Sequence, residues 1–221
     1  MNSSEILSHI DHTLLKATAS WSEIQQLCDE ASRLKTASVC IPPSFVKRVH
    51  EAYGDQINIC TVIGFPLGYH EKNAKLAELV QAREDGAAEF DMVVNLGDIK
   101  DGHFDKVTDE IRSLKDAADG LILKVIIETC YLTEDEKIAL CSCVTNGGAD
   151  YIKTSTGFGT AGATIEDVRL FKAHIGPSVK IKAAGGVRTR EDLELFLAEG
   201  CDRIGTSSAV KLLSGETATA Y

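Results

Sequence analysis

Short runs of β-favouring residues alternate with amphipathic segments along the whole chain. The amphipathic segments predict helices, and the first of them places Trp21, Ile24, Leu27, Cys28 and Ala31 on one face at helical spacing. Several open with a capping box or a close variant, at Ser20–Glu23, Thr133–Glu136, Thr164–Asp167 and Thr189–Asp192. The runs between them predict eight strands, at His9–His12, Ser38–Ile41, Ile57–Ile63, Glu89–Asn95, Leu121–Glu128, Asp150–Thr154, Val179–Ala183 and Asp202–Gly205.

Eight strand–helix units in alternation predict a parallel sheet, because parallel neighbours need a crossover connection and a helix provides one. Eight strands also close a (β/α)8 TIM barrel, and the 221 residues of the chain are close to the usual size of that fold, about 250. An open, doubly wound sheet is the alternative. We expect one barrel domain over residues 1–221, with a mobile polar tail at 214–221.

Several predicted strands carry charged residues at alternate positions, and alternate residues of a barrel strand point into the lumen. The lumen-facing positions of the fourth, fifth and seventh strands are Glu89, Asp91, Val93 and Asn95; Lys124, Ile126 and Glu128; and Lys180 and Lys182. An ionised group inside a barrel is costly unless it is paired, so several of them indicate a site rather than a plain core. The competing interpretation places some of these charges at strand ends, in solvent.

The composition narrows the class of partner. The chain has 23 Lys and Arg against 33 Asp and Glu, a formal net charge of −10, and a negative protein repels nucleic acid and anionic lipid. We therefore expect a small-molecule substrate, with neither nucleic acid nor membrane as a partner. The seven cysteines lack C-x-x-C spacing and the six histidines form no H-E-x-x-H, which predicts reduced core thiols and no metal. No secretory signal or long apolar stretch is seen, so we expect a cytoplasmic protein.

Two lysines and an aspartate are predicted to meet at the C-terminal ends of the strands, where this fold places its chemistry: Asp91, Lys153 and Lys182. Lys153 and Lys182 come from neighbouring strands, which lie about 4.8 Å apart. Two ammonium groups at such a distance disfavour each other's charge, so we expect one pKa to fall and to leave a neutral amine near pH 7 that can form an imine with a carbonyl. Asp91 would keep the other lysine charged and move a hydroxyl proton. Lone lysines, by contrast, are mostly solvated surface residues.

Loops after the last two strands predict a phosphate site. The candidates are Gly185, Gly186 and Arg188 after the seventh strand, and Gly205, Ser207 and Ser208 after the eighth, before a short final helix. Glycines let the backbone approach a ligand, and loops seven and eight with such a helix are the usual phosphate site of a TIM barrel. Either pair of small residues alone is common turn material.

A further glycine pattern, Gly157, Gly159 and Gly162, spells the G-x-G-x-x-G of a dinucleotide cradle. That fingerprint belongs on the first βα turn, with an acidic residue about 20 positions on. Here it follows the sixth strand, and the residues about 20 positions on are Val179–Lys182. We therefore interpret Gly157 as making room beside Lys153 and adding an amide for phosphate. An NAD(P)-dependent oxidoreductase is kept as the alternative.

At these residues the sequence resembles the deoxyribose-phosphate aldolases, which are class I, imine-forming aldolases. The similar segments run in order over nearly the whole chain: IDHTLLK (10–16), SVCIPPSF (38–45), VIGFPLG (62–68), EFDMVVN (89–95), KVIIETCYL (124–132), YIKTSTGFG (151–159), KAAGGVRT (182–189) and IGTSSA (204–209). The resemblance implies a lyase that reversibly cleaves 2-deoxy-D-ribose 5-phosphate to acetaldehyde and D-glyceraldehyde 3-phosphate without a cofactor, in the catabolism of deoxyribonucleosides. A barrel that binds a phosphosugar without catalysis is the remaining alternative, and a homodimer is the assembly that we consider.

The resemblance also implies roles for particular residues. Lys153 is the imine-forming lysine, and Asp91 and Lys182 are the proton-transfer pair. Asp11 and Lys124 either orient water and charge or are structural. The phosphate would be held by Gly157, Gly185, Gly186, Arg188, Gly205, Ser207 and Ser208. The terminal Tyr221 would fold over the site and shuttle a proton, as in some members. Phe158 stands where some relatives carry a lysine, which places more of the phosphate binding on amides and on Arg188.

Overall fold

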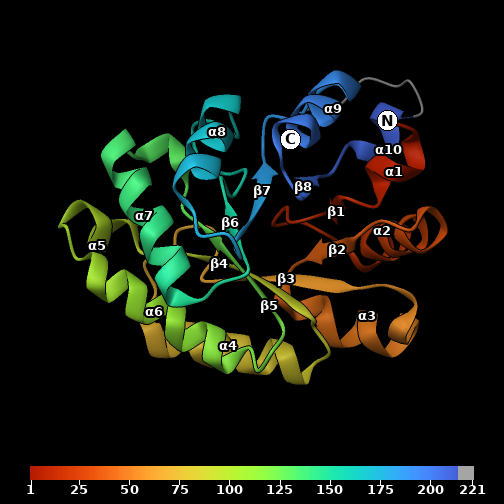
Figure 1. The fold of residues 1–221 in the computed structure, drawn as a ribbon. Coiled ribbons are helices and arrows are strands. Elements are labelled where there is room, and N and C mark those ends of the chain that lie inside the picture. The colour runs from red at the N-terminus through yellow and green to blue at the C-terminus, as the bar shows by residue number, and fades with distance from the viewer. Residues whose placement is uncertain (214–221) are drawn as a thin grey trace.

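The computed structural model describes residues 1–213, in which eight parallel strands close into a barrel (Figure 1). Each strand pairs with the next, and β8 returns to pair with β1, so the open-sheet alternative is wrong. Residues 214–221, including Tyr221, lie outside the described part of the chain. The strands are β1 (Ile10–Thr13), β2 (Ser38–Ile41), β3 (Ile59–Ile63), β4 (Glu89–Val93), β5 (Ile122–Ile126), β6 (Tyr151–Lys153), β7 (Lys180–Ala184) and β8 (Arg203–Thr206).

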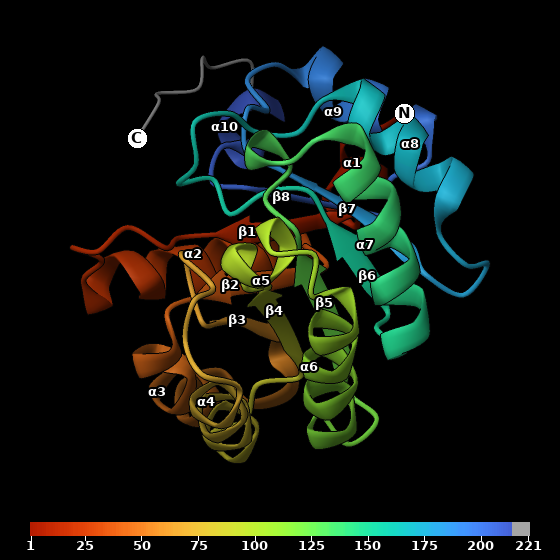
Figure 2. The same cartoon turned by 90° about the vertical axis from the view of Figure 1, so that its left-hand side faces the viewer.

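Helices surround the strands, as the view in Figure 2 shows. Three of the predicted N-termini carry capping boxes, those of Ser20, Thr133 and Thr189, while the Thr164 side chain accepts the Asp167 N–H. The helices are α1 (Ser3–Leu7), α2 (Trp21–Leu34), α3 (Val46–Tyr53), α4 (Lys72–Glu84), α5 (Leu96–Lys100), α6 (Phe104–Ala117), α7 (Glu134–Gly147), α8 (Ile165–His174), α9 (Arg190–Glu199) and α10 (Ala209–Leu213), with 3-10 turns η1 (Pro43–Phe45), η2 (Gly54–Gln56) and η3 (Thr129–Tyr131).

The apolar core lies between the strands and the helices. Phe90 and Met92 of β4 and Val125 of β5 are fully buried and belong to the same cluster as the inner faces of the helices. Helix α2 contributes Ile24, Leu27, Cys28 and Ala31 to this core as predicted, while Trp21 is half-buried under the guanidinium of Arg48, 3.8 Å from the ring centroid. The outward face of each strand is therefore used for packing, which leaves the inward face for polar groups.

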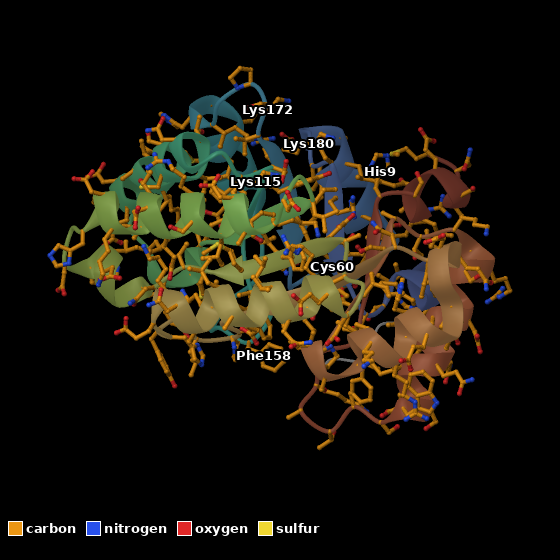
Figure 3. The ribbon with its side chains drawn as sticks, turned by 90° about the horizontal axis from the view of Figure 1, so that it is seen from below. His9, Cys60, Lys115, Phe158, Lys172 and Lys180 are labelled. Carbon is orange, nitrogen blue, oxygen red and sulfur yellow. The ribbon has the colours of Figure 1, made fainter. Side chains whose placement is uncertain are left out.

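Two residues expected on the lumen side of the strands lie elsewhere. Lys180 is exposed at the first position of β7, and Figure 3 places it at the opposite end of the molecule from Phe158. Asn95 lies beyond the end of β4, where its side chain caps α5 by accepting the Gly97 N–H at 3.0 Å. For Lys180, the interpretation that places such charges at strand ends in solvent is the correct one.

All seven cysteines are free thiols, and six of them are buried, in agreement with the expected core role; Cys130 is half-buried. Within residues 1–213, no helix has both the length and the apolar character needed to cross a lipid bilayer.

Candidate active site

Asp91, Lys153 and Lys182 meet inside the barrel. Lys153 and Lys182 are direct partners in the register of β6 and β7, and both side chains point to the lumen. Their Nζ atoms donate to the same carboxylate oxygen, Oδ2 of Asp91 on β4, at 2.7 and 2.6 Å. Asp91 and Lys182 are fully buried, whereas Lys153 is 3% exposed. The three residues predicted from alternation and strand order are therefore in direct contact.

Four further charged side chains join these three: Asp11, Glu89, Lys124 and Arg203. We call the seven residues together the lumen network. Lys124 Nζ lies 2.9 Å from Asp91 Oδ1 and 2.5 Å from Glu89 Oε2, and Lys182 also pairs with Asp11. Arg203 of β8 bridges Asp11 and Glu89, the latter at 3.1 Å. Asp11 and Lys124 thus contact the predicted catalytic residues.

Arg203 was missed by the sequence analysis. The sequence does hold a signal for it, because Arg203 is the register partner of Lys182 on the neighbouring strand and shares its inward side with Gly205, two residues on. An arginine at the first residue of a short strand is otherwise easily taken for a solvated strand end, which is what Lys180 proves to be.

Opposing effects set the electrostatics of the network. Burial works to raise the pKa of Asp91, but Lys124, Lys153 and Lys182 outweigh it and hold that pKa well below its ordinary value. For Lys182, burial works to lower the pKa, and the charges of Asp11 and Asp91 outweigh it, so the pKa lies above its ordinary value. Lys182 is therefore a stable cation. The predicted pair of adjacent ammonium groups is in fact bridged by a carboxylate oxygen.

A cavity of about 490 Å³ opens at the C-terminal ends of the strands. Lys153 reaches its surface, and so do Leu15 and Phe158. All of the predicted phosphate residues also line it: Gly157, Gly185, Gly186, Arg188, Gly205, Ser207 and Ser208. Residues from three loops far apart in the sequence therefore converge on one space with the candidate nucleophile. The expected short helix is present as α10, which begins directly after Ser208.

Each of the three glycines of G-x-G-x-x-G is required by a different local constraint. Gly157 lines the cavity and has φ +88°, a conformation that favours glycine. A Cβ on Gly159 would lie 2.8 Å from Cys130 Sγ, and one on Gly162 would lie 2.3 Å from the carbonyl carbon of Gly185. Helix α8 does not follow the motif directly but begins at Ile165. The motif is thus a close-packed loop beside the cavity and not the start of a dinucleotide-binding helix.

The loop after β6 is fastened by Glu128, a residue that the sequence analysis assigned only to the lumen face. The buried Glu128 carboxylate accepts the Thr156 N–H at 3.2 Å and also the Thr156 hydroxyl. Its backbone is left-handed, with φ +53°, which is uncommon for a residue other than glycine. Burial raises the pKa of Glu128. The contact fixes Thr156 and Gly157 at the wall of the cavity, next to Lys153.

Phe158 forms part of the cavity mouth. About half of its side chain is exposed (52%), and its ring meets Phe65 edge-on with centroids 5.4 Å apart. Phe158, which stands where a cation is found in some relatives, therefore places an apolar side chain beside the candidate phosphate loops.

The closed barrel, with two lysines sharing one carboxylate oxygen behind an open cavity, defines an enzyme site suited to imine chemistry. Comparison with known proteins gives the family. The model of the DeoC/LacD family aldolases matches residues 6–210, and the chain belongs to that family.

Individual relatives agree. The deoxyribose-phosphate aldolase of Clostridium botulinum is 63% identical over 221 residues, the full length of both chains, and that of Clostridioides difficile is 56% identical over 98% of this chain and 99% of its own. A solved structure, described as the unique tetrameric structure of deoxyribose phosphate aldolase from Aeropyrum pernix, has a TM-score of 0.90 at 32% identity and covers 97% of this chain and 92% of its own. The oxidoreductase alternative has no support among these findings.

Proposed function

We propose that this aldolase reversibly cleaves 2-deoxy-D-ribose 5-phosphate to acetaldehyde and D-glyceraldehyde 3-phosphate through an imine on Lys153. The observation that carries the proposal is the sharing of one Asp91 oxygen by Lys153 and Lys182, with Lys153 alone of the three reaching the cavity. The names of the relatives support the choice of substrate.

The charges of the lumen network support Lys153 as the amine that reacts. The network has four cations and three carboxylates, so loss of one proton leaves equal numbers of each. Lys124, Lys182 and Arg203 each contact at least two of the carboxylates. Lys153 contacts Asp91 only, among the described residues. Neutralising Lys153 therefore costs fewer ion pairs than neutralising any other cation of the network.

The steps up to cleavage of the carbon–carbon bond each have a group to perform them. Neutral Lys153 attacks C1 of the open-chain sugar, and water leaves to give a protonated imine, which accepts the electrons of the C2–C3 bond. Asp91 and Lys182 take the C3 hydroxyl proton through a water as that bond breaks. Glyceraldehyde phosphate departs, the enamine is protonated, and hydrolysis frees acetaldehyde. Lys182 keeps its own charge and holds the Asp91 carboxylate ionised until that carboxylate takes the proton.

Phosphate binding is assigned to the loops at the cavity mouth. Gly185 and Gly186 have φ of +75° and +77°, conformations that glycine adopts at no steric cost and that let the main chain approach a ligand. Arg188 adds the cation, and Gly157, Gly205, Ser207 and Ser208 complete the lining. Because Phe158 is apolar, this site depends on amides and on Arg188.

A trapping experiment tests the proposal. Borohydride reduction in the presence of acetaldehyde should leave a two-carbon adduct on Lys153, located by peptide mass spectrometry. Lys153→Met should abolish release of glyceraldehyde 3-phosphate from deoxyribose 5-phosphate, and Lys182→Met should lower kcat by roughly a hundredfold or more. Lys180→Met is the matched control, since Lys180 is an exposed lysine on the same strand as Lys182. Turnover by Lys153→Met, or active protein without the adduct, would refute the assignment.

Four finer points belong to the same proposal. We take residues 1–221 as one domain, in the cytoplasm, where the free thiols would stay reduced. A homodimer is the expected assembly, which sedimentation equilibrium would test. Tyr221 is the expected proton shuttle, and a chain ending at Ala220 should therefore exchange the methyl protons of acetaldehyde with solvent more slowly than the full chain does.

A further inference from the structure

Two thiols in the wall of the lumen have no part in this mechanism. Cys40 of β2 and Cys60 of β3 are direct partners in the register of these neighbouring parallel strands, and both are fully buried. With Val62 they form a small cluster separate from the main core, against which Leu15 and Phe65 pack. Since Leu15 also lines the cavity, the cluster lies directly behind the cavity wall.

The thiols are close enough to be joined. The sulfur atoms of Cys40 and Cys60 and a carboxylate oxygen of Asp91 all lie within 4.8 Å of one another. Neighbouring strands are about 4.8 Å apart, within the range of Cα separations that a disulfide spans, about 4.4 to 6.8 Å. We propose that Cys40 and Cys60 form an oxidation site, at which a peroxide converts the two thiols into a disulfide inside the barrel.

The surroundings assign a role to each sulfur. Cys60 donates its S–H to Asp91 Oδ1 at 3.2 Å, and Lys124 Nζ lies 3.2 Å from Cys60 Sγ. Cys60 holds its proton, because that proton is donated to the Asp91 carboxylate and burial raises the pKa of Cys60. Cys40 is therefore the sulfur that ionises first and attacks the peroxide, and Cys60 is the resolving thiol.

The reaction balances with hydrogen peroxide as the oxidant. The Cys40 thiolate attacks one peroxide oxygen, the O–O bond breaks, and the departing hydroxide takes the proton that Cys40 had lost to give water; the product is a sulfenic acid. Cys60 sulfur then attacks the sulfenic sulfur, the S–O bond breaks, and the leaving hydroxide takes the Cys60 proton as a second water. Two thiols are oxidised, one peroxide is reduced, and two waters form.

The same atoms could hold a thiophilic metal ion, but the charges favour oxidation. Lys124, Lys153 and Lys182 all lie within 2.9 Å of the Asp91 carboxylate, and a divalent cation would have to bind among them. A disulfide carries no charge and meets no such repulsion. The oxidant has a short distance to cover as well, because Leu15 both lines the cavity and packs against the two thiols.

A disulfide would act on the chemistry through Asp91. It removes the proton that Cys60 donates to Asp91 Oδ1 and draws β2 and β3 together beside that carboxylate. Displacements of about 1 Å near a reacting group lower rates by up to roughly a hundredfold, so we expect a loss of aldolase activity of at least about tenfold. This loss rests on the proposed function, whereas formation of the disulfide does not.

The experiment uses the full chain with Cys130→Ser, which removes the half-buried thiol. After hydrogen peroxide treatment, intact mass should show the loss of two hydrogen atoms, and peptide mapping should join Cys40 to Cys60. Dithiothreitol should restore both the mass and the activity. Cys40→Ser or Cys60→Ser should each abolish the loss of two hydrogen atoms, and Cys201→Ser, which removes a buried thiol of the outer core, should retain it.

Clear outcomes would overturn the proposal. The oxidation site is refuted if the mass spectra show only oxygen addition at Cys40, a disulfide with another partner, or no change. Because this readout is a mass and not a rate, it stands even if the assigned substrate is wrong. A disulfide-linked protein that keeps its full activity would overturn the link to Asp91.

Discussion

Arg203→Met tests whether the lumen network stabilises the fold. The Arg203 side chain is 11% exposed and bridges Asp11 and Glu89. Methionine keeps an unbranched side chain at this position but removes the charge. Loss of one partner from a buried pair costs about 3–5 kcal/mol because the other charge is left uncompensated. Here Asp11 keeps Lys182, and Glu89 keeps Lys124 at 2.5 Å, so we expect a smaller cost of about 2–3 kcal/mol.

Urea unfolding at pH 7 would measure this cost. The matched control is Arg190→Met, which breaks an exposed pair with Glu194 at 3.1 Å and should cost less than about 1 kcal/mol. A double-mutant cycle adds Glu89→Met and the double variant. Because the double variant removes both charges of the pair, it should cost at least about 1 kcal/mol less than the sum of the two single variants.

Two results would refute this reasoning. Equal losses of stability for Arg203→Met and Arg190→Met would mean that water screens the bottom of the lumen as it does the surface. Additive losses in the cycle would mean that Arg203 stabilises the barrel through contacts other than its charge. Either result would also weaken the charge count on which a neutral Lys153 depends.

Three further predictions concern other contacts. Burial raises the pKa of Asp11, but Lys182, Lys124 and Arg203 outweigh it and leave the pKa below its ordinary value. The stabilisation from ionised Asp11 is therefore fully present above the unfolded pKa, about 3.9, and is lost progressively as the pH falls from there toward the folded pKa. The unfolding free energy of Asp11→Asn should therefore fall less steeply between about pH 5 and pH 3 than that of the wild type. Glu128→Ala should raise KM for deoxyribose 5-phosphate roughly tenfold in steady-state assays, with a smaller change in kcat, because Thr156 loses its anchor. Lys75→Met and Glu110→Leu should each cost about 3–5 kcal/mol in urea unfolding, and the double variant much less, because the pair is buried.

Each of these has a control and a contrary result. For Asp11, a slope with pH equal to that of the wild type would show that its pKa is not lowered in the fold. For Glu128, unphosphorylated deoxyribose is the control, and an equal rise of KM for both sugars would place the effect outside the phosphate loops. For the pair of α4 and α6, Lys72→Met breaks the exposed neighbour pair with Asp109 and should cost less than about 1 kcal/mol; a double variant as unstable as the sum would refute the argument.

The barrel could be predicted from the sequence because eight β-favouring runs and the helices between them each bury an apolar face. Strand ends were less exact. The fourth strand was expected to run to Asn95 but ends at Val93, since the Asn95 side chain accepts the Gly97 N–H in the first turn of α5 instead of continuing the ladder. Side-chain capping of this kind competes with strand pairing and leaves no mark in the alternation.

The central triad could be predicted for a related reason. In a closed parallel barrel the order of strands is fixed, so inward residues at matching heights must meet, and Lys153 and Lys182 are register partners. Height along the strand is the quantity that alternation cannot supply. Lys180 lies on the same side of β7 as Lys182 but two residues nearer the start of the strand, where it is exposed to solvent. Arg203 lies at the height of Lys182 and is buried.

The spacing of the glycine motif fits a dinucleotide cradle, and only its position after the sixth strand and the residues about 20 positions on argued against that chemistry. In a dinucleotide cradle all three glycines serve one ligand. Here Gly157 lines the cavity, Gly159 leaves room for the Cys130 side chain, and Gly162 packs on the Gly185 backbone. Two of the three constraints come from residues far along the chain and become visible only when the loops after β5, β6 and β7 are side by side. A pattern of glycines thus indicates where backbone segments pack closely, and the charged residues nearby indicate which chemistry the site can perform.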